Sequence, residues 1–324
     1  MVTRAVITAT GSYLPEKVMS NVDLEKIVDT SDEWIVQRSG IRNRHIANDT
    51  ETAGFMGTKA CEKVLEMAGL TGADIDDIIV ATTTADKTFP SVAVQIQNNI
   101  SAPVGVAFDV QAVCSGFVYA LGVADSMIQT GQLKRVLVVG TERMSSILNW
   151  EDRTTCVLFG DGAGAVLLEA QEGTGDKSDR GIHASVMKAN GAYQDILYTD
   201  GGVSTTQLSG HIVMHGKEVF KKAVGYLSEV VEDVLVKCDL EQDDIDWLIP
   251  HQANIRIIET AAKKLGVSMD KVVVTLDNHG NTSAASIPLA LDYANRSGKV
   301  KKNDVVLFEA LGGGITWGAV VLRF

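Results

Sequence analysis

The chain contains an internal repeat, and this repeat restricts the fold more than any other feature of the sequence. The segment Leu70–Ile79 matches Leu240–Ile249 at an offset of 170 residues. The same offset aligns Tyr119-Ala120-Leu121 with Leu289-Ala290-Leu291. We therefore expect two similar halves in which strands alternate with helices.

The polar, glycine-containing stretch Gln171–Arg180 marks the boundary between the halves, which we place at 1–175 and 176–324. Alternation of strands and helices implies mostly parallel sheets, covered on both faces and joined by right-handed crossovers. In the repeat, Cys114 falls opposite Ala284. We expect the N-termini of the two matching helices to face one central site.

Composition excludes several classes of protein. A formal net charge of -12 over 324 residues argues against a general nucleic-acid or membrane-surface binder, because phosphate contacts need positive charge. No stretch approaches the roughly 20 apolar residues of a membrane span, and the N-terminus lacks the layout of a signal peptide. The sequence thus predicts a cytoplasmic protein. Its four cysteines are far apart, which favours reduced thiols over disulfides or zinc sites.

One cysteine occupies a position with chemical meaning. Cys114 follows an apolar run ending at Val110 and precedes a helical pattern that Gly131 stops. The unpaired N–H groups at a helix N-terminus favour an anion, which lowers the pKa of a thiol and makes it reactive. The alternative is a buried structural cysteine, a common core residue. The stretch by itself does not decide between the two.

Three further segments carry candidate functional groups. His251 follows a predicted strand that ends at Pro250, a position suited to a general base or a hydrogen-bond donor. Asn281 lies in a loop of small residues that leads into a helix, where it could act chemically or only cap the helix. Gly312-Gly313-Gly314 could direct backbone N–H groups at a substrate oxygen, or form a tight hairpin.

A basic cluster stands out in this acidic chain. It comprises Trp34, Arg38, Arg42, Arg44 and His45, and it could bind phosphates or form a solvated face. His211 and His215 are four residues apart, but no third ligand accompanies them, so we expect no metal site.

Taken together, these segments resemble the β-ketoacyl-acyl carrier protein (ACP) synthase III family, the thiolase-fold condensing enzymes that start bacterial fatty acid synthesis. The resemblance covers nearly the whole chain. It rests on the segments 11–15, 30–35, 108–110 with Cys114, 159–165, 250–254, 280–286 and 312–314, in this order.

The resemblance implies an α/β thiolase-like fold of two pseudo-symmetric halves in an α-β-α-β-α sandwich. It identifies Cys114 as the nucleophile that takes an acyl group from acetyl-CoA or another short acyl-CoA. It gives His251 and Asn281 the task of holding the enolate formed when malonyl-ACP loses CO2, so that acetoacetyl-ACP is the product. The N–H groups of Cys114 and Gly313 would form the oxyanion hole. No metal or other cofactor is implied; coenzyme A enters as the substrate thioester.

The resemblance also implies several binding residues and a homodimer. Trp34, Arg38 and Arg153 match coenzyme A contacts, and Phe89 matches a residue that closes the acyl pocket of the partner subunit. Carrier protein is acidic, so the basic surface near the His251 segment is its expected docking site. The residues assigned to that site are Lys221, Gln252, Ala253, Asn254, Ile255, Arg256, Lys263 and Lys264.

One local difference leaves the starter chain open, because the segment 111–115 is bulkier than the alanine-rich version common in the family. Two other functions remain to be tested. The first is a thiolase-fold relative that uses free coenzyme A thioesters in secondary metabolism, which the basic residues disfavour. The second is a non-catalytic partner subunit, which the presence of Cys114 disfavours.

Overall fold

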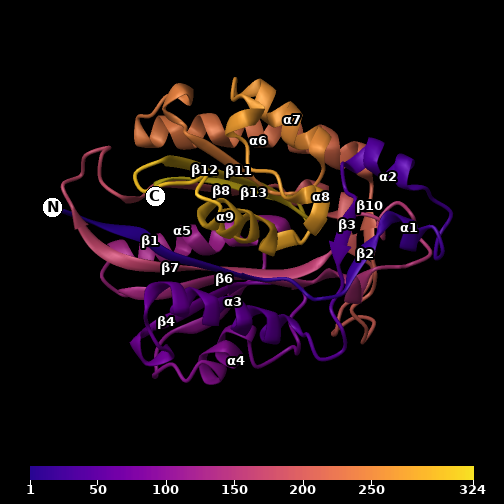
Figure 1. Cartoon of the computed structure of the whole chain (residues 1–324), viewed down its shortest axis with the longest axis horizontal. Helices are drawn as coiled ribbons and strands as arrows, with labels where there is room; N and C mark the ends of the chain where they lie inside the picture. The colour runs from indigo at the N-terminus through magenta and orange to yellow at the C-terminus, as the bar shows by residue number, and fades with distance from the viewer.

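The computed structural model describes all 324 residues and arranges them in alternating layers of helix and sheet (Figure 1). The layers follow the order α-β-α-β-α, as the resemblance implies. Two sheets lie on either side of a central helical layer, and further helices cover their outer faces.

The sheet of the N-terminal half has five strands in the order β1-β7-β6-β4-β5. Strand β4 is parallel to β5 and β6, whereas β7 is antiparallel to both β6 and β1. The strands span Val2–Tyr13 (β1), Asp77–Ala81 (β4), Ala107–Val110 (β5), Arg135–Arg143 (β6) and Asp161–Gly173 (β7).

The sheet of the C-terminal half has four strands in the order β11-β12-β13-β8. Strand β11 is parallel to β12, and β13 is antiparallel to β12 and β8. The strands span Gly181–Ala189 (β8), Trp247–Pro250 (β11), Val305–Gly312 (β12) and Thr316–Arg323 (β13).

The prediction of mostly parallel sheets is therefore wrong, since both sheets are mixed. The reason lies in the connections. Only a short turn joins β12 to β13, and the segment between β6 and β7 contains no α-helix. Without a crossover helix, the chain returns alongside the strand it has just left, which gives antiparallel pairing.

The central layer consists of α5, Gly116–Gln129, and α9, Ser286–Arg296, both of which contact both halves. In Figure 1, α3 and α4 lie below the five-stranded sheet, and α6 and α7 lie above the four-stranded sheet. These outer helices span Ala53–Ala68 (α3), Val92–Asn99 (α4), Gly216–Cys238 (α6) and Ile255–Lys264 (α7).

Smaller elements surround one end of the layers. Two-stranded sheets pair β2 with β3 and β9 with β10. These elements span Val18–Ser20 (β2), Asn43–His45 (β3), Leu197–Thr199 (β9), Ile212–Met214 (β10), Asn21–Leu24 (α1), Asp32–Ser39 (α2) and Leu276–His279 (α8). No helix of the chain combines the length and the apolar character that a membrane crossing requires.

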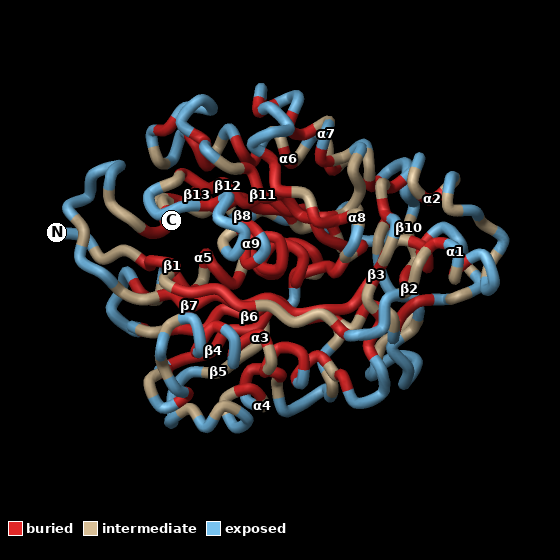
Figure 2. Tube along the Cα trace, in the orientation of Figure 1, coloured by how far each residue is buried: buried red, intermediate tan, exposed pale blue.

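The sequence repeat corresponds to a structural repeat. A 3-10 turn at Val113–Ser115 leads into α5, and a 3-10 turn at Ser283–Ala285 leads into α9. The two turns pack against each other, and a Cβ added to Gly116 would lie 3.5 Å from the Cβ of Ala284. The expected meeting of the two helix N-termini is thus confirmed. Figure 2 shows the central helices and both sheets largely buried.

Candidate active site

Cys114 lies in the 3-10 turn between β5 and α5 and is only 4% exposed. The preceding residue, Val113, has a φ of +49°, a backbone conformation that is costly for a β-branched residue. At Gly116, a Cβ would lie 3.1 Å from the Cβ of Ala81. A strained residue before Cys114 and a small one after it therefore fix the cysteine at the start of α5.

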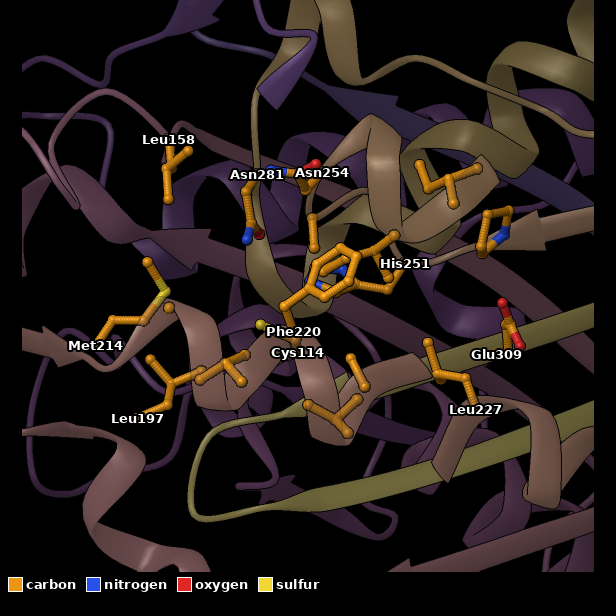
Figure 3. Close-up of a pocket in the computed structure, with 18 of the residues that line it drawn as sticks. Cys114, Leu158, Leu197, Met214, Phe220, Leu227, His251, Asn254, Asn281 and Glu309 are labelled. Atoms are coloured by element: carbon orange, nitrogen blue, oxygen red, sulfur yellow. The ribbon is translucent and has the colours of Figure 1, made fainter. Parts of the chain in front are cut away.

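Cys114, His251 and Asn281 line one cavity of about 150 Å³. Each comes from a different element: His251 directly follows β11, and Asn281 lies in the loop between α8 and α9. Figure 3 shows their side chains around a common space. The remaining wall is mostly apolar and includes Leu158, Phe159, Leu197, Val219, Phe220 and Leu311. The fold thus brings together the three residues singled out from distant parts of the sequence.

The hydrogen bonds around His251 favour one tautomer of its imidazole. Its Nδ1 lies 2.6 Å from Ser286 Oγ, which also accepts a hydrogen bond from the backbone N–H of Gln252 at 3.3 Å. With that bond accepted, the Ser286 hydroxyl can donate its own proton to Nδ1, which leaves the other ring proton on Nε2. Nε2 is buried without a protein partner. Burial lowers the pKa of His251 to about 3, so the ring is neutral at neutral pH and acts as a donor.

The side chain of Asn281 acts as a cap for the backbone and also reaches the cavity, so both roles considered for it from the sequence are compatible with its position. Its Oδ1 accepts the backbone N–H of Ser283 at 2.9 Å, as a capping side chain would. Its Nδ2 donates no hydrogen bond within the protein and lies at the cavity that Figure 3 shows. The amide is therefore held at one end and available to a ligand at the other.

The glycine turn packs directly on the backbone of Cys114. A Cβ added to Gly312 would lie 2.5 Å from the Ala112 carbonyl oxygen and 2.9 Å from the Cys114 nitrogen. Among the backbone hydrogen bonds of turns, loops and caps, none is donated by the N–H group of Cys114 or of Gly313. The turn is a tight hairpin between β12 and β13, and it also leaves two backbone donors beside the thiol.

The expected lowering of the Cys114 pKa is wrong. Burial raises the pKa of the Cys114 thiol to about 12. The Ser283 hydroxyl opposes this shift, and the Glu142 carboxylate adds to it. Desolvation is the largest cause, and it outweighs the hydrogen bonds of the Ser283 hydroxyl and of the Cys114 backbone N–H, which lower the pKa. The thiol is protonated at rest and must lose its proton as it attacks.

Two buried carboxyl groups near this site escaped the sequence analysis. Glu142 on β6 is fully buried and accepts several hydrogen bonds. Glu309 on β12 lines the catalytic cavity, and neither of its carboxylate oxygens has a partner. Burial raises the pKa of Glu142 to about 7 and that of Glu309 to about 8. The available signal was an acidic residue shortly after an apolar run, 136–139 before Glu142 and 305–308 before Glu309.

A second cavity, of about 270 Å³, also has Cys114 in its wall. Its lining is more than half apolar and includes Gln111, Val113, Met144, Ile147, Ile212 and Gly313. The cysteine therefore stands between two spaces, one containing His251 and Asn281 and the other containing neither.

An open depression continues outward from the catalytic cavity. Trp34 makes contacts with two guanidinium groups, with Arg38 at 4.9 Å and Arg153 at 5.2 Å from the centroid of its ring. Trp34 and Arg38 line the depression together with Lys217, Phe220, Asn254 and Arg256, whereas Arg153 lies outside its wall. Phe220 and Asn254 also line the catalytic cavity, so the two spaces adjoin.

The residues of the basic cluster near the N-terminus have different environments and different roles. Arg44 is fully buried and donates to Asn21 Oδ1 and the Val157 carbonyl oxygen, so it is neither a phosphate ligand nor part of a solvated face. His45 contacts the Pro15 carbonyl oxygen. Only Trp34 and Arg38 of the original cluster line the depression.

The expected carrier-protein residues are not all accessible. Lys221, Arg256, Lys263 and Lys264 are exposed on α6 and α7, and Ala253, Asn254 and Ile255 are half-buried. Gln252 is 1% exposed, and its amide bonds to backbone groups of Pro250, Val273, Thr275 and Leu276. Its assignment to a docking surface is wrong, because the side chain holds the loop together. Phe89 is 82% exposed.

A thiol between two cavities, with an imidazole and an amide beside it in a five-layered double-sheet fold, defines a thiolase-fold condensing enzyme. No group of three or more His, Cys, Asp or Glu side chains is placed to hold a metal ion. Comparisons with known proteins narrow the class. Residues 108–191 match the family model of 3-oxoacyl-ACP synthase III, and residues 235–324 match that of its C-terminal part.

A β-ketoacyl-ACP synthase III from Sinorhizobium medicae is 58% identical over 99% of both chains. Among solved structures, the 3-oxoacyl-ACP synthase III of Aquifex aeolicus is 49% identical, with a TM-score of 0.93 over 99% of this chain and 100% of that one. The enzyme of Pseudomonas aeruginosa is 38% identical, with a TM-score of 0.92 and 98% of its chain covered. The chain belongs to the 3-oxoacyl-ACP synthase III family. It is an acyltransferase that carries out the initiating condensation of fatty acid biosynthesis.

Proposed function

We propose that Cys114 carries the acyl group between two half-reactions in this cavity. In the first, Cys114 Sγ attacks the carbonyl carbon of acetyl-CoA or another short acyl-CoA, and the coenzyme A thiolate leaves. The N–H groups of Cys114 and Gly313 would hold the oxyanion of the tetrahedral intermediate. The observation that carries the proposal is the shared cavity of Cys114, His251 and Asn281.

In the second half-reaction, malonyl-ACP loses its carboxylate as CO2 and leaves a thioester enolate. His251 Nε2–H and Asn281 Nδ2–H donate to the enolate oxygen, which is where the negative charge develops. The enolate carbon attacks the acyl group on Cys114 and expels the cysteine thiolate. The products are acetoacetyl-ACP, for an acetyl starter, and CO2. Every step uses side chains and backbone groups of the chain itself.

The two cavities and the depression suggest how the substrates approach the thiol. The depression around Trp34 and Arg38 suits an adenine stacked on an aromatic ring and phosphates near guanidinium groups. The catalytic cavity would then hold the thioester arm, and the cavity of about 270 Å³ would take the acyl chain. Arg153 would contribute by stacking on Trp34.

The acyl-enzyme is tested by the intact mass of the protein after mixing with acetyl-CoA, isobutyryl-CoA and octanoyl-CoA separately. A gain of one acyl group that disappears in Cys114→Ala supports the proposal, and the preferred donor identifies the starter. A folded protein that gains no acyl group from any donor would overturn the proposal and favour a non-catalytic subunit.

We also propose that malonyl-ACP docks on the basic surface formed by Lys221, Arg256, Lys263 and Lys264. These residues are exposed on α6 and α7, and Arg256 also lines the depression that adjoins the catalytic cavity. Lys263→Glu, at an exposed residue outside the wall of the depression around Trp34, should raise KM for malonyl-ACP while leaving turnover with malonyl-CoA unchanged. Lys299→Glu, beyond the far end of α9, is the control. Equal turnover of malonyl-CoA and malonyl-ACP by the unaltered protein would instead favour a synthase of secondary metabolism.

A homodimer completes the proposal. Phe89 is exposed without apolar cover, as expected of a residue that enters a partner subunit. Phe89→Ala should weaken dimerisation or increase the length of the acyl chain that the enzyme accepts, measured by light scattering and by the donor series above.

The division of the chain into halves at 175/176 and a cytoplasmic location stay predictions. The segment between β7 and β8 joins the two sheets.

A further inference from the structure

The cavity of about 270 Å³ beside Cys114, which we call the acyl cavity, is large for a short acyl chain. An apolar cavity of about 150 Å³ already holds a benzene ring. The volume of the acyl cavity therefore excludes neither a straight nor a branched short chain. Selection between such chains must depend on the shape of the cavity next to the thiol.

Two branched side chains adjoin Gly313, at the end of the acyl cavity nearest the thiol. A Cβ built on Gly313 would lie 3.6 Å from Val113 Cγ2 and 3.3 Å from Leu197 Cγ. Val113, Leu197 and Gly313 all line the acyl cavity. We call the side chains of Val113 and Leu197 the inner wall of this cavity.

Val113 is the member of the inner wall that belongs to the acyl cavity alone, whereas Leu197 also lines the catalytic cavity. The backbone before Val113 is fixed, since the Ala112 carbonyl oxygen accepts the Ser115 N–H at 3.2 Å and the Thr316 hydroxyl at 3.0 Å. The side chain is stiff as well, because two carbons on Cβ restrict its χ1 angle. Val113 is thus poorly able to move aside for a wider acyl group.

The backbone conformation makes a branched side chain costly at this position. The φ of Val113 is +49°, which is unfavourable for a residue with a Cβ and most of all for a β-branched one. Burial in the core does not offset this cost fully, because the side chain is only half-buried. A costly side chain that borders a substrate cavity indicates a function at that cavity.

The proposed oxyanion hole would place the acyl group against the inner wall. The N–H groups of Cys114 and Gly313 would hold the carbonyl oxygen of the acyl group. The α-carbon is bonded to the same carbonyl carbon, so it would lie near Gly313, where Val113 Cγ2 is located. A straight chain carries two hydrogens at this carbon. An α-branched chain replaces one of them with a methyl group, which would meet the Val113 side chain.

We propose that Val113 makes the protein selective for straight-chain acyl-CoA starters by excluding a branch at the α-carbon. The inference rests on the proposed acyl-enzyme and names the class of starter that Cys114 accepts. Val113 acts through the width of the cavity next to the thiol and takes no part in the chemical steps.

The outer end of the acyl cavity provides a position for comparison. It adjoins an open hollow with a mostly polar wall, which includes Thr82, Thr84, Lys87, Thr88 and Ser146. Ile147 lines both the acyl cavity and this hollow and is 6% exposed. A smaller residue at Ile147 would therefore add volume to the acyl cavity without changing its inner wall.

Butyryl-CoA and isobutyryl-CoA test the proposal, because they contain the same atoms and differ only in the branch at the α-carbon. Acylation of Cys114 in a single turnover is followed by rapid quenching and intact mass, at equal concentrations of each donor. The unaltered protein should react at least about 10-fold faster with butyryl-CoA, a typical effect of one carbon in an apolar pocket. In Val113→Ala the two rate constants should lie within about threefold of each other.

The ratio of the two rate constants protects the test against misfolding, because both come from the same folded fraction of a variant. Val113→Thr keeps a β-branched side chain of the same shape and should keep the preference for butyryl-CoA. Ile147→Ala removes more atoms than Val113→Ala, but from the outer end, and should also keep the preference. Val236→Ala, at an exposed residue of α6, is the control for the substitution itself.

Similar rates with the two donors in the unaltered protein would overturn the proposal, and so would an unchanged ratio in Val113→Ala. A ratio reduced as strongly in Val113→Thr or in Ile147→Ala would also overturn it, because the width of the inner wall would then not decide. Failure of the unaltered protein to form an adduct with acetyl-CoA or with either of these donors would overturn the proposed function instead.

Discussion

Val113 and Ser283 adopt the same rare backbone conformation, each with a φ of +49°, and they are 170 residues apart in the two halves of the repeat. Each begins the 3-10 turn that leads into a central helix. In one half the strained residue positions the following Cys114, and in the other it directs its own hydroxyl at Glu142. The shared backbone geometry therefore serves the site from both sides, with different side chains.

The close packing of the glycine turn predicts the effect of Gly312→Ala. The new methyl group would meet the Ala112 carbonyl oxygen and displace the N–H groups beside the thiol. Loss of one oxyanion donor typically costs about 100-fold or more in rate. We expect a comparable drop in the rate of Cys114 acylation, measured by rapid quenching, and a loss of about 1–3 kcal/mol in stability. Gly191→Ala, where no atom lies within 4 Å of the new Cβ, should change neither.

The contact between Ser286 and His251 predicts a defect confined to the second half-reaction. Ser286→Ala removes the hydroxyl that holds the imidazole and its tautomer. The lost hydrogen bond stabilises the productive orientation of the imidazole by about 1 kcal/mol, so its loss should slow condensation by roughly fivefold to tenfold. Acylation of Cys114 should keep its rate, since it does not use His251. Ser297→Ala, at the other end of α9, serves as the control, and a parallel fall in both half-reactions would contradict the assigned role.

The sequence allowed us to predict helices such as the one after Cys114 and the approach of the two central helix N-termini, because both predictions follow from local patterns and from the repeat. The helix after Cys114, its end near Gly131 and the position of Cys114 opposite Ala284 could be read from periodicity and the repeat. The mixed sheets could not, because strand direction depends on how the chain returns after β6 and β12. Burial produced the other errors. The Cys114 pKa, the buried Gln252 amide and the roles of Arg44, Glu142 and Glu309 depend on which neighbours exclude water, and single-sequence patterns do not report this.

The position of Trp34 beside Arg38 and Arg153 predicts a defect that depends on the nucleotide. Trp34→Ala removes the ring on which an adenine would stack, a contact worth about 1–2 kcal/mol. KM for acetyl-CoA should rise roughly tenfold, while kcat stays within a factor of two. With an acetyl-pantetheine substrate, which lacks the nucleotide, the variant and the unaltered protein should have equal KM. A rise of KM for both substrates would contradict the prediction, because it would mean that Trp34 contacts the thioester arm and not the adenine.

The unpartnered carboxyl group of Glu309 predicts a pH-dependent stability. Burial raises its pKa to about 8 in the folded protein, above the ordinary value of 4.5. The folded state therefore binds the proton more tightly, and the resulting stabilisation is present below about pH 4.5 and is lost as the pH rises through about 8. Glu142 contributes in the same direction, and the buried His251 and His279, whose pKa values are lowered by burial, contribute in the opposite direction at acid pH.

Glu309→Gln isolates the contribution of this one group, because it keeps the size of the side chain and removes its titration. At pH 5, where Glu309 is protonated, the two proteins should differ by about 1 kcal/mol or less, since both bury a neutral polar group. At pH 9 the variant should be more stable by a few kcal/mol, as it avoids a buried charge. Thermal unfolding across this range measures the difference, with Glu172→Gln on the exposed end of β7 as control. A difference that does not change with pH would mean that Glu309 titrates normally and that water reaches it in the folded protein.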